Sequence, residues 1–221
     1  MHKTNKNFVR NDTDLDGAIK VLDIVIPPEA DVKLPDPSLL SYYNDRQDRI
    51  IYIDSEIDDC TYEITKQIYE YNRQDKDIPI ENRKPIKIYI NSFGGDLYQC
   101  FALISAIGAS KTPVYTINTG VAMSAGMIIL LSGHKRFAVK YSIAMCHSGS
   151  GSVGGDFEQT QSAMENYKKM VDTMKSYILE RTKIDSKTLS RKWTKDWYFS
   201  SSEQLEYNIV QEIANSLDDI I

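Results

Sequence analysis

The chain has 221 residues, 42% of them hydrophobic and 26% charged, which is enough apolar material for one sizeable core. Its 26 lysines and arginines stand against 31 aspartates and glutamates, a formal charge of −5. The chain therefore lacks the basic excess that gathers nucleic-acid phosphates, and we expect no nucleic-acid partner. Cys60, Cys100 and Cys146 are too few and too far apart for a disulfide framework or a structural zinc site, which indicates a reducing compartment.

The longest uncharged stretch, residues 112–132, has about the ~20 residues of a membrane span. Polar residues, glycines and a proline interrupt it, and only Met127–Leu131 is continuously apolar, which is too short to cross a bilayer. No apolar segment follows the basic residues near the start of the chain, as a secretory signal would require. We therefore expect a soluble cytoplasmic protein that does not contact a membrane.

Residues 1–41 are predicted to form an arm rather than a domain. Four of the seven prolines lie in the first 37 residues, and acidic residues break up the apolar patches between them. Proline fixes backbone angles and removes hydrogen-bond donors, so this arm should be extended or turn-rich. Residues 42–221 then form the single domain.

In that domain, apolar runs of strand length alternate with apolar residues at helical spacing. The alternation predicts an α/β fold of parallel β-α-β units with right-handed crossovers. The expected strands are residues 49–54, 86–90, 114–119, 137–139, 143–146 and 209–213, and the expected helices are residues 60–73, 97–110, 124–131 and 156–182. Ser201–Gln204 has capping-box spacing ahead of a short helix, and Asn208 can end that helix in left-handed geometry.

The longest predicted helix carries one apolar stripe. Met164, Tyr167, Val171, Met174 and Ile178 are spaced by three or four residues, so their side chains share a face. Such a stripe must be buried, either in this chain or on a neighbour.

Ser124 lies in a segment of small residues, Gly120–Gly126, between a predicted strand and an apolar helix. Small neighbours permit a sharp turn that exposes the hydroxyl, and a helix N-terminus favours the negative charge that develops during acyl transfer. The pattern fits a nucleophile, and by itself it fits a packing serine equally well.

Asn91–Asp96 follows a predicted strand directly and contains Gly94 and Gly95. Glycines let backbone N–H groups approach a ligand closely, so this loop can form an oxyanion hole, or it can be a turn before a helix. Neither Gly-x-Gly-x-x-Gly nor Gly-Lys-Ser/Thr, the two glycine-rich patterns that bind phosphate, is present.

Of the three histidines, His2 lies in the arm and His134 in a charged turn, whereas His147 ends an apolar strand ahead of a glycine-rich loop. Parallel sheets present catalytic side chains at such strand ends. If the protein uses a serine and a base, His147 is the best candidate for the base. The neighbouring Cys146 points to the opposite face of the strand, so we expect no zinc site.

From about residue 42 to residue 213, these motifs together resemble the Clp protease proteolytic subunit (ClpP) family of serine peptidases. Asn91–Gly95 is similar to that family's Asn-Ser-Pro-Gly-Gly, and Gly120–Gly126 to its nucleophile segment. Met145–His147 stands where the family has Met-Ile-His, and Leu179–Thr182 resembles the turn after its long helix. The resemblance implies a ClpP/crotonase-like α/β fold of repeated β-β-α units with a long protruding handle helix.

The resemblance also implies a serine endopeptidase with Ser124 as nucleophile and His147 as general base. Counting from His147 without a gap places the family's acidic residue at Asp196, with Asp185 as the fallback. A carboxylate at that position holds the imidazole tautomer and stabilises the imidazolium.

The oxyanion donors implied by the resemblance are the backbone N–H groups of Gly94 and Ala125. Acylation and deacylation of the serine then require no metal and no bound cofactor.

In that family, two heptameric rings stack into a homo-oligomeric tetradecamer that encloses the active sites, and an ATP-consuming AAA+ unfoldase feeds in unfolded polypeptides. The apolar stripe of the long helix and the Gly/Ser-rich Ser148–Gly155, expected to be an extended strand, are suitable material for the ring contacts. Tyr89 matches an aromatic residue of the unfoldase docking pocket, or it is part of the strand core.

The chain departs from the family pattern at several positions. Phe93 and Gly149 replace prolines, and Thr194 and Lys195 replace an aspartate and an arginine that help to set ring assembly. Three alternatives to an active, unfoldase-fed endopeptidase remain open: a non-catalytic or activator-dependent ring subunit, a phage-type maturation protease, and a crotonase-type acyl-CoA enzyme.

Overall fold

The computed structural model describes residues 19–21, 24–26, 39–151, 154–216 and 219–220. The chain divides into two compact units, residues 1–48 and 49–221. In the first unit, β1 (Ile19–Val21) and β2 (Ile24–Ile26) form an antiparallel pair, and α1 spans Leu40–Asp48. All four prolines of the predicted arm lie outside the described residues, so the arm and its boundary at residue 41 stay predictions.

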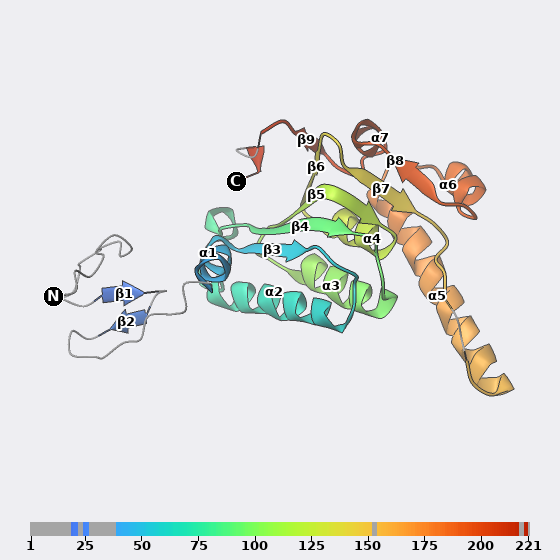
Figure 1. The fold of residues 1–221 in the computed structure, drawn as a ribbon, viewed down its shortest axis with the longest axis horizontal. Coiled ribbons are helices and arrows are strands. Elements are labelled where there is room, and N and C mark those ends of the chain that lie inside the picture. The colour runs from blue at the N-terminus through green and yellow to red at the C-terminus, as the bar shows by residue number, and fades with distance from the viewer. Residues whose placement is uncertain (1–18, 22–23, 27–38, 152–153, 217–218, 221) are drawn as a thin grey trace, which may run out of the picture. The chain divides into compact units, whose positions relative to one another are not determined.

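The second unit is built on one mostly parallel sheet (Figure 1). β3, β4, β5, β6 and β9 lie side by side in that order and are all parallel. β7 pairs parallel with the carboxyl-terminal half of β5, and β8 pairs antiparallel with β7. The strands are β3 (Ile50–Ile53), β4 (Ile86–Ser92), β5 (Val114–Met123), β6 (Lys135–Val139), β7 (Ile143–Cys146), β8 (Trp197–Phe199) and β9 (Glu212–Ala214).

Helices cover this sheet and enclose the core. All eight residues of α4 are buried, because the helix packs against β5, α3 and α5. The helices are α2 (Tyr62–Gln74), α3 (Leu97–Ala109), α4 (Ala125–Ser132), α5 (Phe157–Arg181), α6 (Ser186–Lys192) and α7 (Ser201–Glu206), with short 3₁₀ turns at Asp59–Thr61 and Ile80–Asn82. No helix in the described ranges is both long and apolar enough to span a bilayer.

The α/β class and the long handle helix predicted from the sequence are confirmed (Figure 1). On α5, Met174 and Ile178 are buried in the chain's own core, whereas Met164 is 55% exposed. The apolar stripe is therefore covered near the carboxyl-terminal end of α5 and open near its amino-terminal end, which projects beyond the sheet (Figure 1).

Some predicted boundaries are wrong. The capping box of α7 is formed by Ser200 and Glu203, one residue earlier than predicted, because the Ser200 hydroxyl accepts the N–H of Glu203. The last strand is residues 212–214 rather than 209–213, since the N–H groups of Ile209 and Val210 both donate to the Gln204 carbonyl of α7 and do not pair with β6. The described residues of the expected Gly/Ser strand, 148–151 and 154–155, form no strand.

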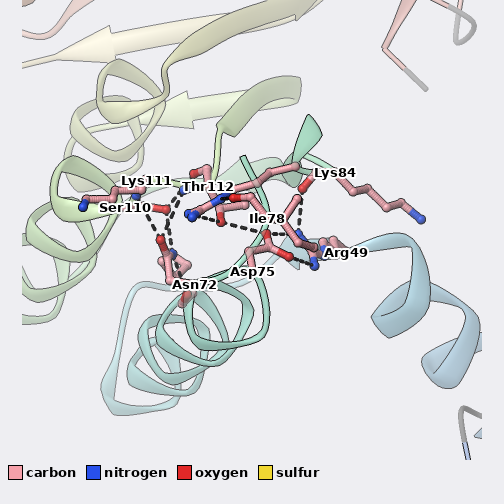
Figure 2. A network of polar contacts seen from close by, with 10 residues as sticks. Arg49, Asn72, Asp75, Ile78, Lys84, Ser110, Lys111 and Thr112 are labelled. Atoms are coloured by element: carbon pink, nitrogen blue, oxygen red, sulfur yellow. Dashed lines mark hydrogen bonds and ion pairs between the residues drawn. The ribbon is translucent and has the colours of Figure 1, made fainter. Parts of the chain in front are cut away.

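A buried polar network ties the end of α2 to the start of β3 and to the loop before β5 (Figure 2). Both guanidinium Nη atoms of Arg49 donate to Asp75 at 2.6 Å, and Arg49 also donates to the Lys84 carbonyl at 2.8 Å. The Thr112 hydroxyl donates to Asp75 at 2.8 Å, and the Asn72 side chain accepts the Thr112 N–H at 3.2 Å. The hydrogen bonds from Arg49 hold the pKa of the Asp75 carboxyl below its ordinary value.

Candidate active site

Ser124 stands at the turn from β5 into α4, with φ 53° and ψ −123°. A residue other than glycine at positive φ is strained, and such strain is concentrated at functional sites. The turn is held because the Ser124 N–H donates to the Met145 carbonyl at 2.8 Å, and the Ser124 carbonyl accepts the Met127 N–H at 3.0 Å. These bonds fix the serine at the amino-terminal end of a buried helix.

His147 reaches Ser124 from the end of β7. The parallel register pairs Met123 of β5 with Met145 of β7, so the residues that follow the two strands meet at the same edge of the sheet. Nε2 of His147 lies 2.8 Å from Oγ of Ser124. At this distance the hydroxyl can donate to an unprotonated Nε2, as required of a nucleophile and its base.

Asp196 lies beside His147 because β7 and β8 are antiparallel. Cys146 pairs with Trp197, so the next residue of β7 and the preceding residue of β8 stand opposite each other. Oδ1 of Asp196 is 3.6 Å from Nδ1 of His147, the Asp196 side chain is 54% exposed, and the Tyr198 hydroxyl donates to its Oδ2 at 3.4 Å. The carboxylate is therefore on the correct side of the imidazole but beyond hydrogen-bond distance.

The fallback acid, Asp185, has a different role. It is the N-cap of α6, and its carboxylate accepts the N–H of Thr188 at 2.9 Å. Hydrogen bonds from Thr188 hold the pKa of Asp185 below its ordinary value. Of the two acids, the structure brings Asp196 to His147.

Replacing Asp196 with asparagine is expected to lower kcat for peptide hydrolysis by about 10²- to 10⁴-fold, because the imidazolium loses its counter-charge and its tautomer is no longer fixed. Because Oδ1 of Asp196 and Nδ1 of His147 are 3.6 Å apart, we expect a loss closer to 10²-fold. Asp185→Asn is the matched control, since asparagine also caps helices. Steady-state kinetics on a fluorogenic peptide checks both variants, and equal losses in the two would contradict the assignment.

Gly94 lies directly against the nucleophile turn. Its φ is 109°, and a Cβ at this position would lie 2.7 Å from the Ser124 Cβ and 3.2 Å from the Ala125 nitrogen. The Gly94 N–H donates to the Ser92 hydroxyl at 3.2 Å, and the Gly94 carbonyl accepts the Ile57 N–H at 2.9 Å. Both predicted oxyanion donors, on Gly94 and Ala125, thus belong to backbone packed around Ser124.

Adding a methyl group in Gly94→Ala is expected to lower kcat by about 10²- to 10³-fold, the loss typical of one oxyanion donor. The added carbon would collide with the Ser124 turn, and L-residues disfavour φ 109°. Gly108→Ala is the control, because a Cβ there meets nothing within 4 Å. Activity close to wild type in Gly94→Ala would exclude a tight contact between this loop and the reacting atoms.

The serine and histidine open into a cleft of about 1020 Å³. Its lining comes from the ends of β3 and β4, the loop 91–98, the segment after His147, and α5. Phe93, which stands where the resembling family has proline, is 75% exposed at this cleft. In the described part of the chain, no three histidine, cysteine, aspartate or glutamate side chains are grouped so as to hold a metal ion.

Sequence reasoning missed several lining residues, among them Asp54, Glu56 and Tyr98. Asp54 and Glu56 directly follow a parallel strand, and that position alone could have placed them at the carboxyl edge of the sheet. Tyr98 had no such signal. Its hydroxyl accepts a hydrogen bond from Asn166 of α5 at 2.7 Å, a contact between segments far apart in the sequence.

Comparison with known proteins gives one consistent result. A family model described as Clp protease matches residues 39–216. The ATP-dependent Clp protease proteolytic subunit 2 of Treponema denticola is 34% identical over 139 residues, 62% of this chain and 70% of that protein. The subunit 2 of Bacillus licheniformis is 31% identical over 76% of this chain and 86% of that protein, and the proteolytic subunit of Deinococcus radiodurans is 28% identical over 76% and 80%.

Proposed function

The chain belongs to the Clp protease family, and from the geometry of its Ser124–His147 pair we propose that it is a serine endopeptidase acting on unfolded polypeptides. One observation carries the proposal: a strained serine at a helix N-terminus lies 2.8 Å from the Nε2 atom of a histidine. A serine that only packs in the core needs neither the positive φ nor the base.

In the proposed reaction, the Ser124 hydroxyl attacks a peptide carbonyl while His147 accepts its proton. His147 then donates that proton to the leaving amine, and water releases the acyl-enzyme by the reverse sequence. Asp196 stabilises the imidazolium. The N–H groups of Gly94 and Ala125 bind the oxyanion, for which the Gly94 N–H exchanges the Ser92 hydroxyl for the substrate oxygen. The chain's own side chains and backbone supply every step, so the proposal includes no cofactor.

We extend the proposal to a cytoplasmic chamber of stacked heptameric rings served by an AAA+ unfoldase, which alone consumes ATP. The open amino-terminal part of α5 offers an apolar surface for contacts between rings. Tyr89 stacks on the exposed Tyr52 with ring centroids 5.5 Å apart, and it also packs against a buried cluster that contains Ile117 and Phe137. Tyr89 thus combines a packing role with proximity to an exposed aromatic ring, which supports a docking role.

Fluorophosphonate labelling of the purified full chain, resolved by size, tests the proposal. Label in a large oligomer of the wild type, absent from Ser124→Ala and strongly reduced in His147→Ala, is the expected result. An assembled ring that takes no label would favour a non-catalytic or activator-dependent subunit, and label that appears on addition of an unfoldase would identify the activator-dependent form. Saturable binding of acyl-CoA without label would favour the crotonase-type alternative.

A further inference from the structure

A buried hydroxyl lies at the base of the loop that carries Gly94. Ser92 is the last residue of β4 and is 1% exposed. Its hydroxyl donates to the Ser55 carbonyl at 2.5 Å and accepts the Gly94 N–H at 3.2 Å. Ser92 and Gly94 both line the cleft. The N–H group of this loop that we expect to bind the oxyanion is therefore already paired within the chain.

Gly94 needs such a partner because the residue is buried. A buried backbone N–H without an acceptor is unfavourable, and nearly all such groups in folded proteins are paired. A serine hydroxyl has one proton, and the bond to Ser55 uses it. The hydroxyl oxygen of Ser92 can therefore serve Gly94 only as an acceptor, which is also the role of a substrate oxygen.

Other bonds hold the loop in place. The Ile57 N–H donates to the Gly94 carbonyl at 2.9 Å, and the Asp96 N–H donates to the Ile57 carbonyl at 2.7 Å. These bonds form a parallel bridge between Ile57 and Gly95, and a Cβ added to Gly95 would lie 2.3 Å from the Ile57 carbonyl oxygen. Because the segment at Ile57 fixes the path of the loop, the Ser92 hydroxyl is not needed for that purpose.

We propose that Ser92 is a positioning residue whose hydroxyl occupies the Gly94 N–H until the oxygen of the substrate displaces it. A serine hydroxyl and a peptide carbonyl are both neutral acceptors, so their exchange contributes little to substrate binding. The oxyanion is charged, and hydrogen bonds to a charged acceptor are about twice as strong as neutral ones. The contribution of the Gly94 N–H then appears mainly in the transition state, where it raises kcat. This inference rests on the proposed peptidase function and deepens its account of the oxyanion hole.

Ser92→Ala in the full-length oligomer tests the inference. The assay uses a slowly cleaved fluorogenic peptide, because the KM of such a substrate approximates its dissociation constant. Without the hydroxyl, the substrate carbonyl no longer competes with an acceptor from the chain, and one neutral hydrogen bond changes an equilibrium constant by about 2- to 12-fold. KM should fall by that factor, while kcat stays within about twofold of wild type because the bound substrate and the transition state gain equally.

Fluorophosphonate labelling gives a second measurement that needs no turnover. The phosphonyl oxygen of the probe takes the place of the substrate oxygen at the oxyanion donors. The second-order rate constant of labelling should therefore rise in Ser92→Ala by the factor by which KM falls.

Two further variants separate this role from a role in packing. Ser92→Cys keeps a side chain of similar size but replaces the hydroxyl oxygen with sulfur, a weak acceptor, so KM should again fall although no cavity is made. Ser132→Ala is the matched control. Ser132 is also buried, and its hydroxyl donates to the Ile129 carbonyl at the carboxyl-terminal end of α4, so kcat and KM should both keep their wild-type values.

A lower kcat with an unchanged or raised KM in both Ser92 variants overturns the inference, because a hydroxyl that only supports the loop gives that result. The proposed function then stands. Unchanged KM and labelling rates in both variants also overturn it, and if Ser92→Ala fails to assemble, the same measurements on Ser92→Cys decide. A wild-type protein that neither hydrolyses the peptide nor takes the label overturns the proposed function and this inference together.

Discussion

Ser124→Ala is expected to abolish peptide hydrolysis, lowering kcat by about 10⁴- to 10⁶-fold and leaving only the background from substrate binding. The reason is chemical: no other hydroxyl in the described residues is bonded to His147. His147→Ala should cost nearly as much, and the double variant little more, because nucleophile and base act as one unit. Steady-state hydrolysis of a fluorogenic peptide by the assembled oligomer measures all three losses.

The matched control is Ser105→Ala. Ser105 is an exposed serine of α3 whose hydroxyl donates to the Phe101 carbonyl of its own helix, so its loss should leave kcat within about twofold of wild type. If Ser124→Ala retained a tenth of the wild-type rate, another nucleophile would be at work. Additive losses in the Ser124 and His147 variants would also contradict a shared mechanism.

The core of the fold could be predicted because its signals are local. Each expected strand from residue 49 to residue 146 overlaps an observed one, since apolar runs between turn residues specify buried parallel strands. Boundaries set by tertiary contacts could not be predicted. β5 continues from residue 119 to Met123 because its second half pairs with β7 after the first half has paired with β6. β7 follows β5 only after α4 and β6, so no short stretch of sequence shows that the two strands pair.

The site residues also divide into those with a local sequence signal and those placed by tertiary contacts. Ser124 and His147 could be assigned from short motifs, because a small-residue turn and a strand end each have a local pattern. Asp196 could be placed by counting along a resembling family, but its 3.6 Å separation from His147 depends on how β8 pairs with β7. The acidic lining of the cleft was missed for a related reason. Asp54 and Asp96 are 42 residues apart in the sequence, and the pairing of β3 with β4 and the bridge from Ile57 to Gly95 bring their segments together.

Asp75→Asn is expected to lower the free energy of unfolding by about 3–5 kcal/mol, the usual cost of leaving one member of a buried ion pair without its partner. The Asp75 and Arg49 side chains are 1% and 12% exposed, so little water can reach the guanidinium of Arg49 once its partner charge is lost. Figure 2 shows the contacts that Asp75 makes with Arg49. Glu63→Gln is the control, because the Glu63–Lys66 pair is 66% and 55% exposed and should change stability by less than about 1 kcal/mol. Urea unfolding at matched protein concentration measures both.

The contribution of Asp75 to the free energy of unfolding should depend on pH. The pKa of Asp75 is lowered in the folded chain by Arg49, whereas the unfolded chain should have the ordinary value of about 3.9. Below that pH the unfolded state binds a proton that the folded state does not, so the contribution of Asp75 is complete at neutral pH and is lost as pH falls through the folded pKa. Asp75→Asn should therefore lose less stability than wild type on going from pH 5 to pH 3, a window that follows from these pKa values. Equal losses in the two proteins would show that the Arg49–Asp75 pair does not stabilise the fold through its charge.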